Sequence, residues 1–337
     1  MTKMYKLMFM TTLIMSTLIS ISAYTWLGMW IGLEINLLSI IPIIKSKNMM
    51  SSESSIKYFI TQAIASTVIL MSIIMMMWKY NTHSSMNNSS LLMIMNSGLL
   101  LKMGMAPLHF WFPEVLEGLN WNNCMLMLTW QKITPMMLLM YNTELTVFYS
   151  SIIISGMIIS SIMSMNQISI RKLMAFSSIN HMGWMMVAMM MEKTIWLIYF
   201  MIYSLITINI ALTMKNTFYL NQLFPYMNTS PMMKMFFMLN FLSLSGIPPF
   251  LGFLPKWMVI QTMVENKMFM LSIIMIAFTL IMIYVYMRIM MTALIMKTSQ
   301  TNWTLKLNMK INHLPVGILN FFLVMSLVLV TTMLNLI

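Results

Sequence analysis

Residues 104–114 read GMAPLHFWFPE, and residues 246–256 read GIPPFLGFLPK. The two stretches align without a gap, pairing Gly104 with Gly246, Pro107 with Pro249 and Pro113 with Pro255. A proline inside a helix removes a backbone donor and interrupts the helix, so each stretch predicts a break. Within a membrane, the backbone groups freed by a break must be satisfied by the protein interior or by water. The sequence therefore predicts two broken helices whose breaks face inward.

The rest of the chain has the composition of a membrane protein. Of its 337 residues, 60% are hydrophobic and 8% are charged, whereas a soluble domain carries about 25% charged residues. The apolar residues come in blocks of about 20, the length that crosses a bilayer core. We expect hydrophobic segments at about 4–22, 24–44, 56–79, 90–118, 123–141, 145–166, 172–190, 194–214, 234–264, 269–296 and 315–336. The predicted fold is an all-α polytopic membrane protein with about 11 transmembrane helices.

The positions of the two breaks predict an internal repeat. They lie in the fourth and ninth segments, and an odd offset makes the two halves cross the membrane in opposite directions. Paired discontinuous helices of this kind are typical of inverted-repeat transporters. We therefore expect one membrane domain over 1–337, with an antiporter-like inverted repeat. Its half-repeats are predicted at about 4–141 and 145–296, followed by a C-terminal helix at about 315–336.

The basic residues between the segments predict the orientation. One side carries twelve of them: Lys3, Lys6, Lys45, Lys47, Lys57, Arg171, Lys172, Lys215, Lys234, Lys297, Lys306 and Lys310. The other side carries three: Lys79, Lys193 and Lys267. By the positive-inside rule the N-terminus lies inside and, with an odd number of spans, the C-terminus outside. These basic loops are explained as topology signals, and no nucleic-acid role is needed for them.

Composition also excludes several kinds of site. All seven acidic residues are Glu, which excludes Asp-based phosphoryl transfer and Asp-rich calcium loops. The single cysteine, Cys124, excludes a disulfide framework, a thiolate zinc site and a cysteine-held iron–sulfur cluster. The four histidines lie far apart without ligand spacing, so no metal site is predicted.

A few charged residues lie inside the predicted spans. They are Glu34, Lys102, Lys132, Lys256 and Arg288. A charge at the centre of a membrane helix costs about 2.5–3.5 kcal/mol, so such residues tend to face the protein or a water-filled interior. A lysine near Glu34 would stay charged while paired and release its proton once Glu34 moved or was neutralised. This series suits proton transfer driven by charge, where each charge crossing 100 mV is worth about 2.3 kcal/mol.

Five blocks of sequence carry a family resemblance. They are GLEINLLSIIPII at 32–44, LLLKMGMAPLHFWFPEVLEGL at 99–119, LTWQKITP at 128–135, RKLMAFSSINHMGWM at 171–185 and SLSGIPPFLGFLPKW at 243–257. Over essentially its whole length, the chain resembles the NADH–ubiquinone oxidoreductase chain 2 family. These are antiporter-like membrane subunits of mitochondrial complex I. The 52 methionines fit an insect-like member of this family.

The resemblance implies a role for each buried charge. Glu34 would be the glutamate that senses charge from the neighbouring subunit, and Lys102 its partner on the first broken helix. Lys132 would link the two half-channels, and Lys256 would pass protons toward the outer face. The water chain between these groups would be lined by His181 and His109.

The resemblance also implies the setting of the chain. It would sit in the mitochondrial inner membrane, with its N-terminus in the matrix and its C-terminus in the intermembrane space. Its partners would be other membrane-arm subunits of complex I, including neighbouring antiporter-like subunits, and membrane lipids. The chain itself would bind no cofactor, since NADH, FMN, iron–sulfur clusters and ubiquinone are used elsewhere in the complex.

Other interpretations of the same residues stay open at this point. The buried charges could form structural ion pairs, and Lys256 or Arg288 could extend to the membrane interface. His181 could be a satisfied interior histidine, and His109 could cap carbonyls freed by the break. For the whole protein, the alternatives are a free-standing monovalent cation/proton antiporter and a membrane scaffold, although a scaffold leaves the buried lysines unexplained.

Overall fold

A computed structural model describes residues 2–46, 48–82, 88–214, 217–223 and 231–295. The described part is helical, apart from turns and one isolated antiparallel bridge between Ser169 and Tyr219. The helices before residue 140 are α1 (Thr2–Ser22), α2 (Trp26–Ile44), α3 (Met49–Thr82), α4 (Asn88–Met103), α5 (Trp111–Gly118), α6 (Trp121–Leu128) and α7 (Trp130–Leu139). After the 3-10 turn η1 (Met140–Asn142) come α8 (Thr146–Ser164), α9 (Ile170–Met191), α10 (Lys193–Thr213), α12 (Pro231–Ser245), α13 (Phe253–Glu265) and α14 (Phe269–Ile295). The predicted C-terminal span at 315–336 lies outside the described residues.

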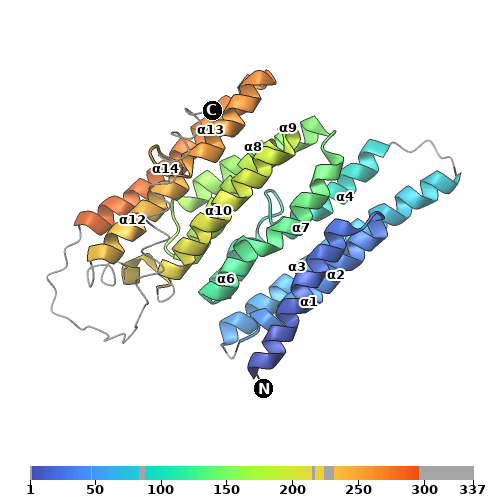
Figure 1. Ribbon diagram of the computed structural model, residues 1–337, viewed down its shortest axis with the longest axis horizontal. Coiled ribbons are helices and arrows are strands. Elements are labelled where there is room, and N and C mark those ends of the chain that lie inside the picture. Colours follow the sequence, from blue (N-terminus) through green and yellow to red (C-terminus); the bar gives the residue numbers. More distant parts are fainter. Residues whose placement is uncertain (1, 47, 83–87, 215–216, 224–230, 296–337) are drawn as a thin grey trace, which may run out of the picture.

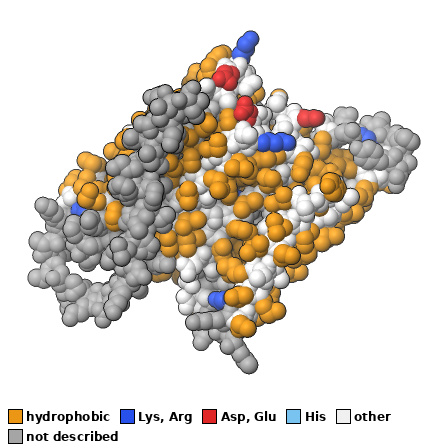
Figure 2. All heavy atoms as spheres, viewed as in Figure 1, with side chains coloured by type: hydrophobic (Ala, Val, Ile, Leu, Met, Phe, Trp, Pro, Cys, Tyr) orange, Lys and Arg blue, Asp and Glu red, His pale blue; other side chains and the backbone are white. Residues whose placement is uncertain are grey.

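The helices form a membrane-spanning bundle. In the described part of the chain, six of them are long and apolar enough to cross a bilayer: α1, α2, α3, α8, α10 and α14. Figure 1 shows the helices running side by side, with α1–α3 at one edge, α12–α14 at the other, and α7 and α10 between them. Side chains on the visible face are mostly hydrophobic, and its few charged groups lie toward the ends (Figure 2). The prediction of an all-helical membrane protein is confirmed.

Helix α9 forms the centre of the second half of the bundle. Nearly all of its side chains are buried, because α9 packs against α5, α8, α10 and α13. It carries polar residues such as Ser178, Asn180 and His181 in this interior position. A helix that is buried all round can hold polar groups away from lipid if neighbouring helices satisfy them.

The two breaks predicted from glycine and proline are present. Helix α4 ends at Met103 and α5 begins at Trp111, while α12 ends at Ser245 and α13 begins at Phe253. Both breaks begin with a glycine in the left-handed region, Gly104 at φ 73° and Gly246 at φ 74°, and both contain a cis X-Pro bond. Only glycine adopts this region without steric cost.

A third helix is also interrupted, and this interruption was not predicted from the sequence. The segment expected to be continuous over 123–141 is divided at Thr129, which has φ −113° and ψ −72°. The Thr129 hydroxyl donates to the Met125 carbonyl at 2.7 Å, and such back-bonding bends helices. The division separates α6 from α7, and α7 begins two residues before Lys132.

Several of the basic residues that the sequence assigned to loops lie within helices, including Lys57, Arg171 and Lys172. Lys57 is in α3, which begins at Met49 instead of near 56, and Arg171 and Lys172 are in the first turn of α9. Polar side chains at these helix ends find ionic or hydrogen-bonding partners, and this extends the helices beyond their apolar segments. The hydrophobic pattern therefore underestimated the length of both helices.

Candidate functional site

Lys132 is fully interior to the bundle. Its side chain, on α7, is 1% exposed, and its Nζ atom donates to the hydroxyl of Tyr203 on α10 at 3.3 Å. The same ammonium lies 5.4 Å from the ring centre of Phe112 and 5.1 Å from that of Tyr203. Aromatic faces attract cations, so a hydroxyl and two rings surround this lysine, and no described carboxylate lies within 4.0 Å of it.

Lys256 is buried beside the second break. It lies in the first turn of α13, is 8% exposed, and its Nζ atom donates to the Ser245 carbonyl at 2.7 Å. That carbonyl is at the end of α12, where the break has freed it from helical bonding. The interpretation that Lys256 extends to the membrane interface is wrong, because the side chain turns inward to cap the broken helix.

Gly246 makes room for this contact. A Cβ atom at residue 246 would lie 2.9 Å from both the Cδ and Nζ atoms of Lys256. The glycine thus serves two purposes, the left-handed backbone of the break and the close approach of the lysine.

Lys102 is buried beside the first break, in the last turn of α4, and is 7% exposed. Its backbone carbonyl accepts from Nε2 of Gln62 at 3.2 Å, and the preceding Leu101 carbonyl accepts from Nε1 of Trp111 at 3.1 Å. The side chains of Gln62 and Trp111 thus cap the carbonyls at this break, and the Lys102 ammonium does not. Its side chain lines a small cavity together with residues of α2, α3 and α7.

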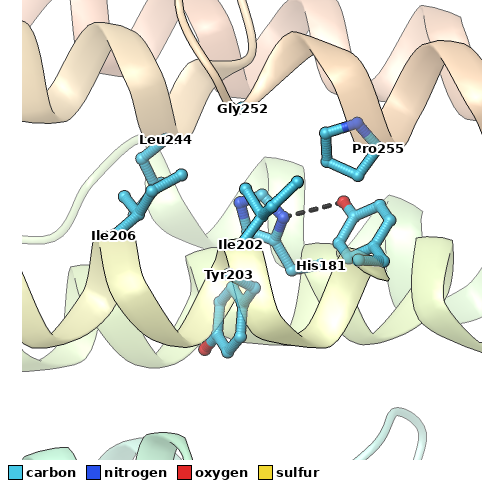
Figure 3. A pocket seen from close by; sticks show the side chains of 8 residues that line it. His181, Ile202, Tyr203, Ile206, Leu244, Gly252 and Pro255 are labelled. Atoms are coloured by element: carbon cyan, nitrogen blue, oxygen red, sulfur yellow. Dashed lines mark hydrogen bonds between the residues drawn. The ribbon is translucent and has the colours of Figure 1, made fainter. Parts of the chain in front are cut away.

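His181 lies near the middle of α9 and is 7% exposed. Its Nδ1 atom is 2.9 Å from the Tyr199 hydroxyl, and its ring centre is 5.2 Å from that of Tyr203. These three side chains line a second cavity, which Leu244 of α12, Gly252 of the second break and Pro255 of α13 close (Figure 3). It leaves a volume of about 10 Å³ for the centre of a water molecule, enough for about one.

Glu34 and His109 are placed less centrally. Glu34 is half-buried on α2 and near enough to Lys102 for an electrostatic interaction, but the two form no salt bridge within 4.0 Å. His109 lies inside the first break, with Nδ1 3.3 Å from the Pro107 carbonyl and its ring against Phe176. That contact is the one expected of a histidine that caps the break.

The structure thus brings Lys132 and His181 together, because both contact Tyr203. Lys256 lies beyond the second cavity, and Lys102 and Glu34 lie on the other side of α7. The sequence did not single out Tyr199 or Tyr203, although their four-residue spacing on one helix face could have suggested a pair. Nor did it single out Gln131, whose amide exchanges hydrogen bonds of 3.0 and 3.1 Å with that of Asn36.

Arg171 was also misjudged. The sequence treated it as a loop charge, but it is 8% exposed, donates from Nη1 to the Leu119 carbonyl at 2.6 Å and lies over the Phe218 ring at 4.5 Å. Its neighbour Lys172 pairs with Glu117 at 2.6 Å. Arg288, by contrast, is exposed on α14. Among the described residues, no group of three His, Cys, Asp or Glu side chains could hold a metal ion.

The chain is similar to known proteins over most of its length. A family model described as NADH:quinone oxidoreductase/Mrp antiporter, TM, matches residues 23–283. The NADH-ubiquinone oxidoreductase chain 2 of Anopheles gambiae is 48% identical over 329 residues, 96% of each chain. This chain belongs to the NADH-ubiquinone oxidoreductase chain 2 family. The protein of the same name from Locusta migratoria is 44% identical, and the match covers 92% of both sequences. The one from Lemur catta is 36% identical, and the match covers 96% of this chain and 94% of the Lemur catta protein.

Solved structures share the fold of this chain 2 family member. A chain of respiratory complex I from Thermus thermophilus with bound aureothin has a TM-score of 0.77 at 20% identity, over 86% of this chain and 70% of its own. A chain of the Mrp complex from Dietzia sp. DQ12-45-1b has a TM-score of 0.71 at 12% identity, over 82% of this chain and 58% of its own. The family resemblance drawn from the five sequence blocks is confirmed.

Proposed function

We propose that this chain is a core membrane subunit of respiratory complex I, and that it translocates protons while other subunits transfer electrons from NADH to ubiquinone. Relatives at 44–48% identity are named NADH-ubiquinone oxidoreductase chain 2. The observation that carries the proton role is the burial of Lys102, Lys132 and Lys256 inside a membrane bundle, at 7%, 1% and 8% exposure. Charges at this depth are costly and are typical of ion and proton pathways.

The proposed path runs through Lys132. On one side of α7 lie Lys102 and Glu34; on the other, Tyr203 connects the Lys132 ammonium to the cavity beside His181. A proton that leaves Lys132 has the Tyr203 hydroxyl as its nearest acceptor. His181 offers a further exchange group beside Lys256, and the burial of all these groups limits leakage of protons from the path.

His109 has a lesser part in this path. Its ring contacts the Pro107 carbonyl and the aromatic rings of Phe110 and Phe176, and it lines neither of the two described cavities. We assign it to support of the break, with proton exchange as a secondary role.

The architecture belongs to the proposal as well. An antiporter-like inverted repeat, with halves at about 4–141 and 145–296 and about 11 transmembrane helices in all, is supported by the matching backbone of Gly104 and Gly246. The gapless alignment of the residues around the breaks supports the same assignment.

The setting follows from the family. We place the chain in the mitochondrial inner membrane beside other membrane-arm subunits and lipids, with its N-terminus in the matrix. In support, Lys57 pairs with Glu114 at 2.9 Å and Lys172 with Glu117 at 2.6 Å, so predicted matrix-side residues of α3 and α9 both contact α5. We expect no cofactor on this chain, since its buried groups are amines, hydroxyls and imidazoles suited to proton exchange.

The test is Lys132→Met in the assembled complex. The substitution keeps the buried volume and removes the exchangeable proton, so NADH-driven quinone reduction and proton pumping should both fall by about tenfold or more while assembly persists. Lys193→Met, at an exposed helix start, is the control and should behave as the unmodified complex. Unchanged pumping in Lys132→Met would exclude the proposed path.

A second measurement separates a complex I subunit from a free-standing antiporter. The native membrane is solubilised gently and the particle that carries this chain is sized. Migration with a large assembly supports the proposal, whereas migration of the chain alone would contradict it.

A further inference from the structure

Helix α7, which carries Lys132, is held weakly by its own backbone. It begins directly after the interruption at Thr129 and gives way after ten residues to the 3-10 turn η1. Pro135, inside the helix, has no N–H, so the Gln131 carbonyl lacks its helical donor. A helix this short depends on tertiary contacts for its stability. Side-chain contacts with neighbouring helices therefore fix the rotation of α7 about its own axis.

A pair of amides joins α7 to α2. The Nδ2 atom of Asn36 donates to Gln131 Oε1 at 3.1 Å, and the Nε2 atom of Gln131 donates to Asn36 Oδ1 at 3.0 Å. From α3, the Tyr58 hydroxyl donates to the same Gln131 oxygen at 3.4 Å. Asn36 and Tyr58 are buried, so solvent outside the bundle does not compete for these bonds. The Gln131 side chain is thus attached to two neighbouring helices.

The contacts of α7 with α10 are weaker. Lys132 Nζ donates to the Tyr203 hydroxyl at 3.3 Å, slightly longer than the usual N–H···O range of about 2.7–3.2 Å. The Trp196 Nε1 atom donates to Met136 Sδ at 3.4 Å, and a thioether sulfur is a weak acceptor. The amide pair is therefore the firmer attachment of this helix.

Gln131 and Lys132 reach opposite neighbours from adjacent positions. Figure 1 shows α7 between α2 and α10, and adjacent side chains on a helix point about 100° apart. A rotation that withdrew Lys132 from Tyr203 would also separate Gln131 from Asn36. We propose that Asn36 and Gln131 are positioning residues for Lys132, and that their reciprocal amide pair fixes the rotation of α7 at which the ammonium meets Tyr203.

The position of the ammonium is tested with Gln131→Met, which keeps the length of the side chain and removes the amide. A map of the assembled variant should show Lys132 Nζ beyond hydrogen-bonding distance of the Tyr203 hydroxyl. An unchanged contact would overturn the proposal. The effect on pumping rests on the proposed proton path, but this distance does not, so it still decides the positioning role if Lys132→Met leaves pumping unchanged.

The pumping rate provides a second measurement. Gln131→Met should lower it by about fivefold, the equivalent of one net hydrogen bond. In a Tyr203→Phe background the same change should cost less than about twofold, because the contact that Gln131 positions is already lost. Equal factors in the two backgrounds would indicate a merely structural role and contradict the proposal. Gln261→Met, on the exposed face of α13, is the control and should pump as the unmodified complex does.

An exchange of the two amides decides the matter if Gln131→Met does not assemble. Gln131→Asn shortens one side of the pair and should lower pumping. Adding Asn36→Gln restores the combined length of the two side chains, so the double variant should recover most of the loss. Full pumping in Gln131→Asn, or a double variant no better than Gln131→Asn, would refute the pairing.

Discussion

The Nζ atom of Lys132 lies 3.3 Å from the hydroxyl of Tyr203, which joins α7 to α10 across 71 residues of sequence. The Tyr203 ring in turn packs against that of His181, whose Nδ1 atom meets the Tyr199 hydroxyl. A lysine, two tyrosines and a histidine therefore form one polar cluster in the middle of an apolar bundle. The cluster lies where the second broken helix approaches α10 (Figure 3).

Tyr203→Phe should slow proton transfer. The change keeps the aromatic ring that faces the Lys132 ammonium but removes the hydroxyl that accepts its hydrogen bond. A hydrogen bond to a charged group is worth about 1.5–3 kcal/mol. We expect NADH-driven pumping to fall by about tenfold in assembled complex. Tyr284→Phe, on the exposed face of α14, is the control. Wild-type pumping in Tyr203→Phe would show that Lys132 uses another acceptor.

Gly246→Ala should destabilise the second break. The left-handed backbone costs an alanine about 1–2 kcal/mol, and the added Cβ would also meet Lys256 at 2.9 Å. We expect less assembled complex and a lower melting temperature. Gly28→Ala, in a helix with ordinary φ and neighbours no closer than 3.1 Å, should have a smaller effect. Equal melting temperatures for the two variants would argue against a requirement for glycine at 246.

Adjacent basic residues at the start of α9 should respond differently to replacement by methionine. Arg171→Met removes a buried hydrogen bond to the Leu119 carbonyl and the contact with Phe218, so assembly should fall clearly. Lys172→Met removes a partly exposed ion pair, 30% and 33% exposed, which is worth about 0–1 kcal/mol. The yield of assembled complex measures both. A larger loss in Lys172→Met would reverse this assignment.

Much of the fold was predictable because it depends on local chemistry. The breaks at Gly104 and Gly246 follow from glycine and proline at fixed offsets, and the burial of Lys102, Lys132 and Lys256 follows from their positions inside apolar segments. The interruption at Thr129 was not predicted, because the nearest proline, Pro135, lies six residues farther along and the Thr129 hydroxyl bond to the Met125 carbonyl has no glycine or proline signature.

The partners of the buried charges were beyond sequence reasoning. Nothing in the sequence around Lys132 points to Tyr203, and Arg171 is indistinguishable from Lys172 as a loop charge until α9 is packed against the 118–120 turn. The sequence also left open what Lys102 and Lys256 contact: Lys256 caps the carbonyl end of α12 at its own break, whereas Lys102 lines a cavity.

By itself, then, the sequence determined that the chain crosses a membrane, where two helices break and that Lys102, Lys132 and Lys256 are retained inside. These properties follow from hydrophobicity and backbone chemistry, which act within a few residues. Only the tertiary structure decided which hydroxyl, carbonyl or cavity each charge meets. Such contacts depend on how helices distant in the chain pack side by side, and a shift of one helix turn would exchange every partner.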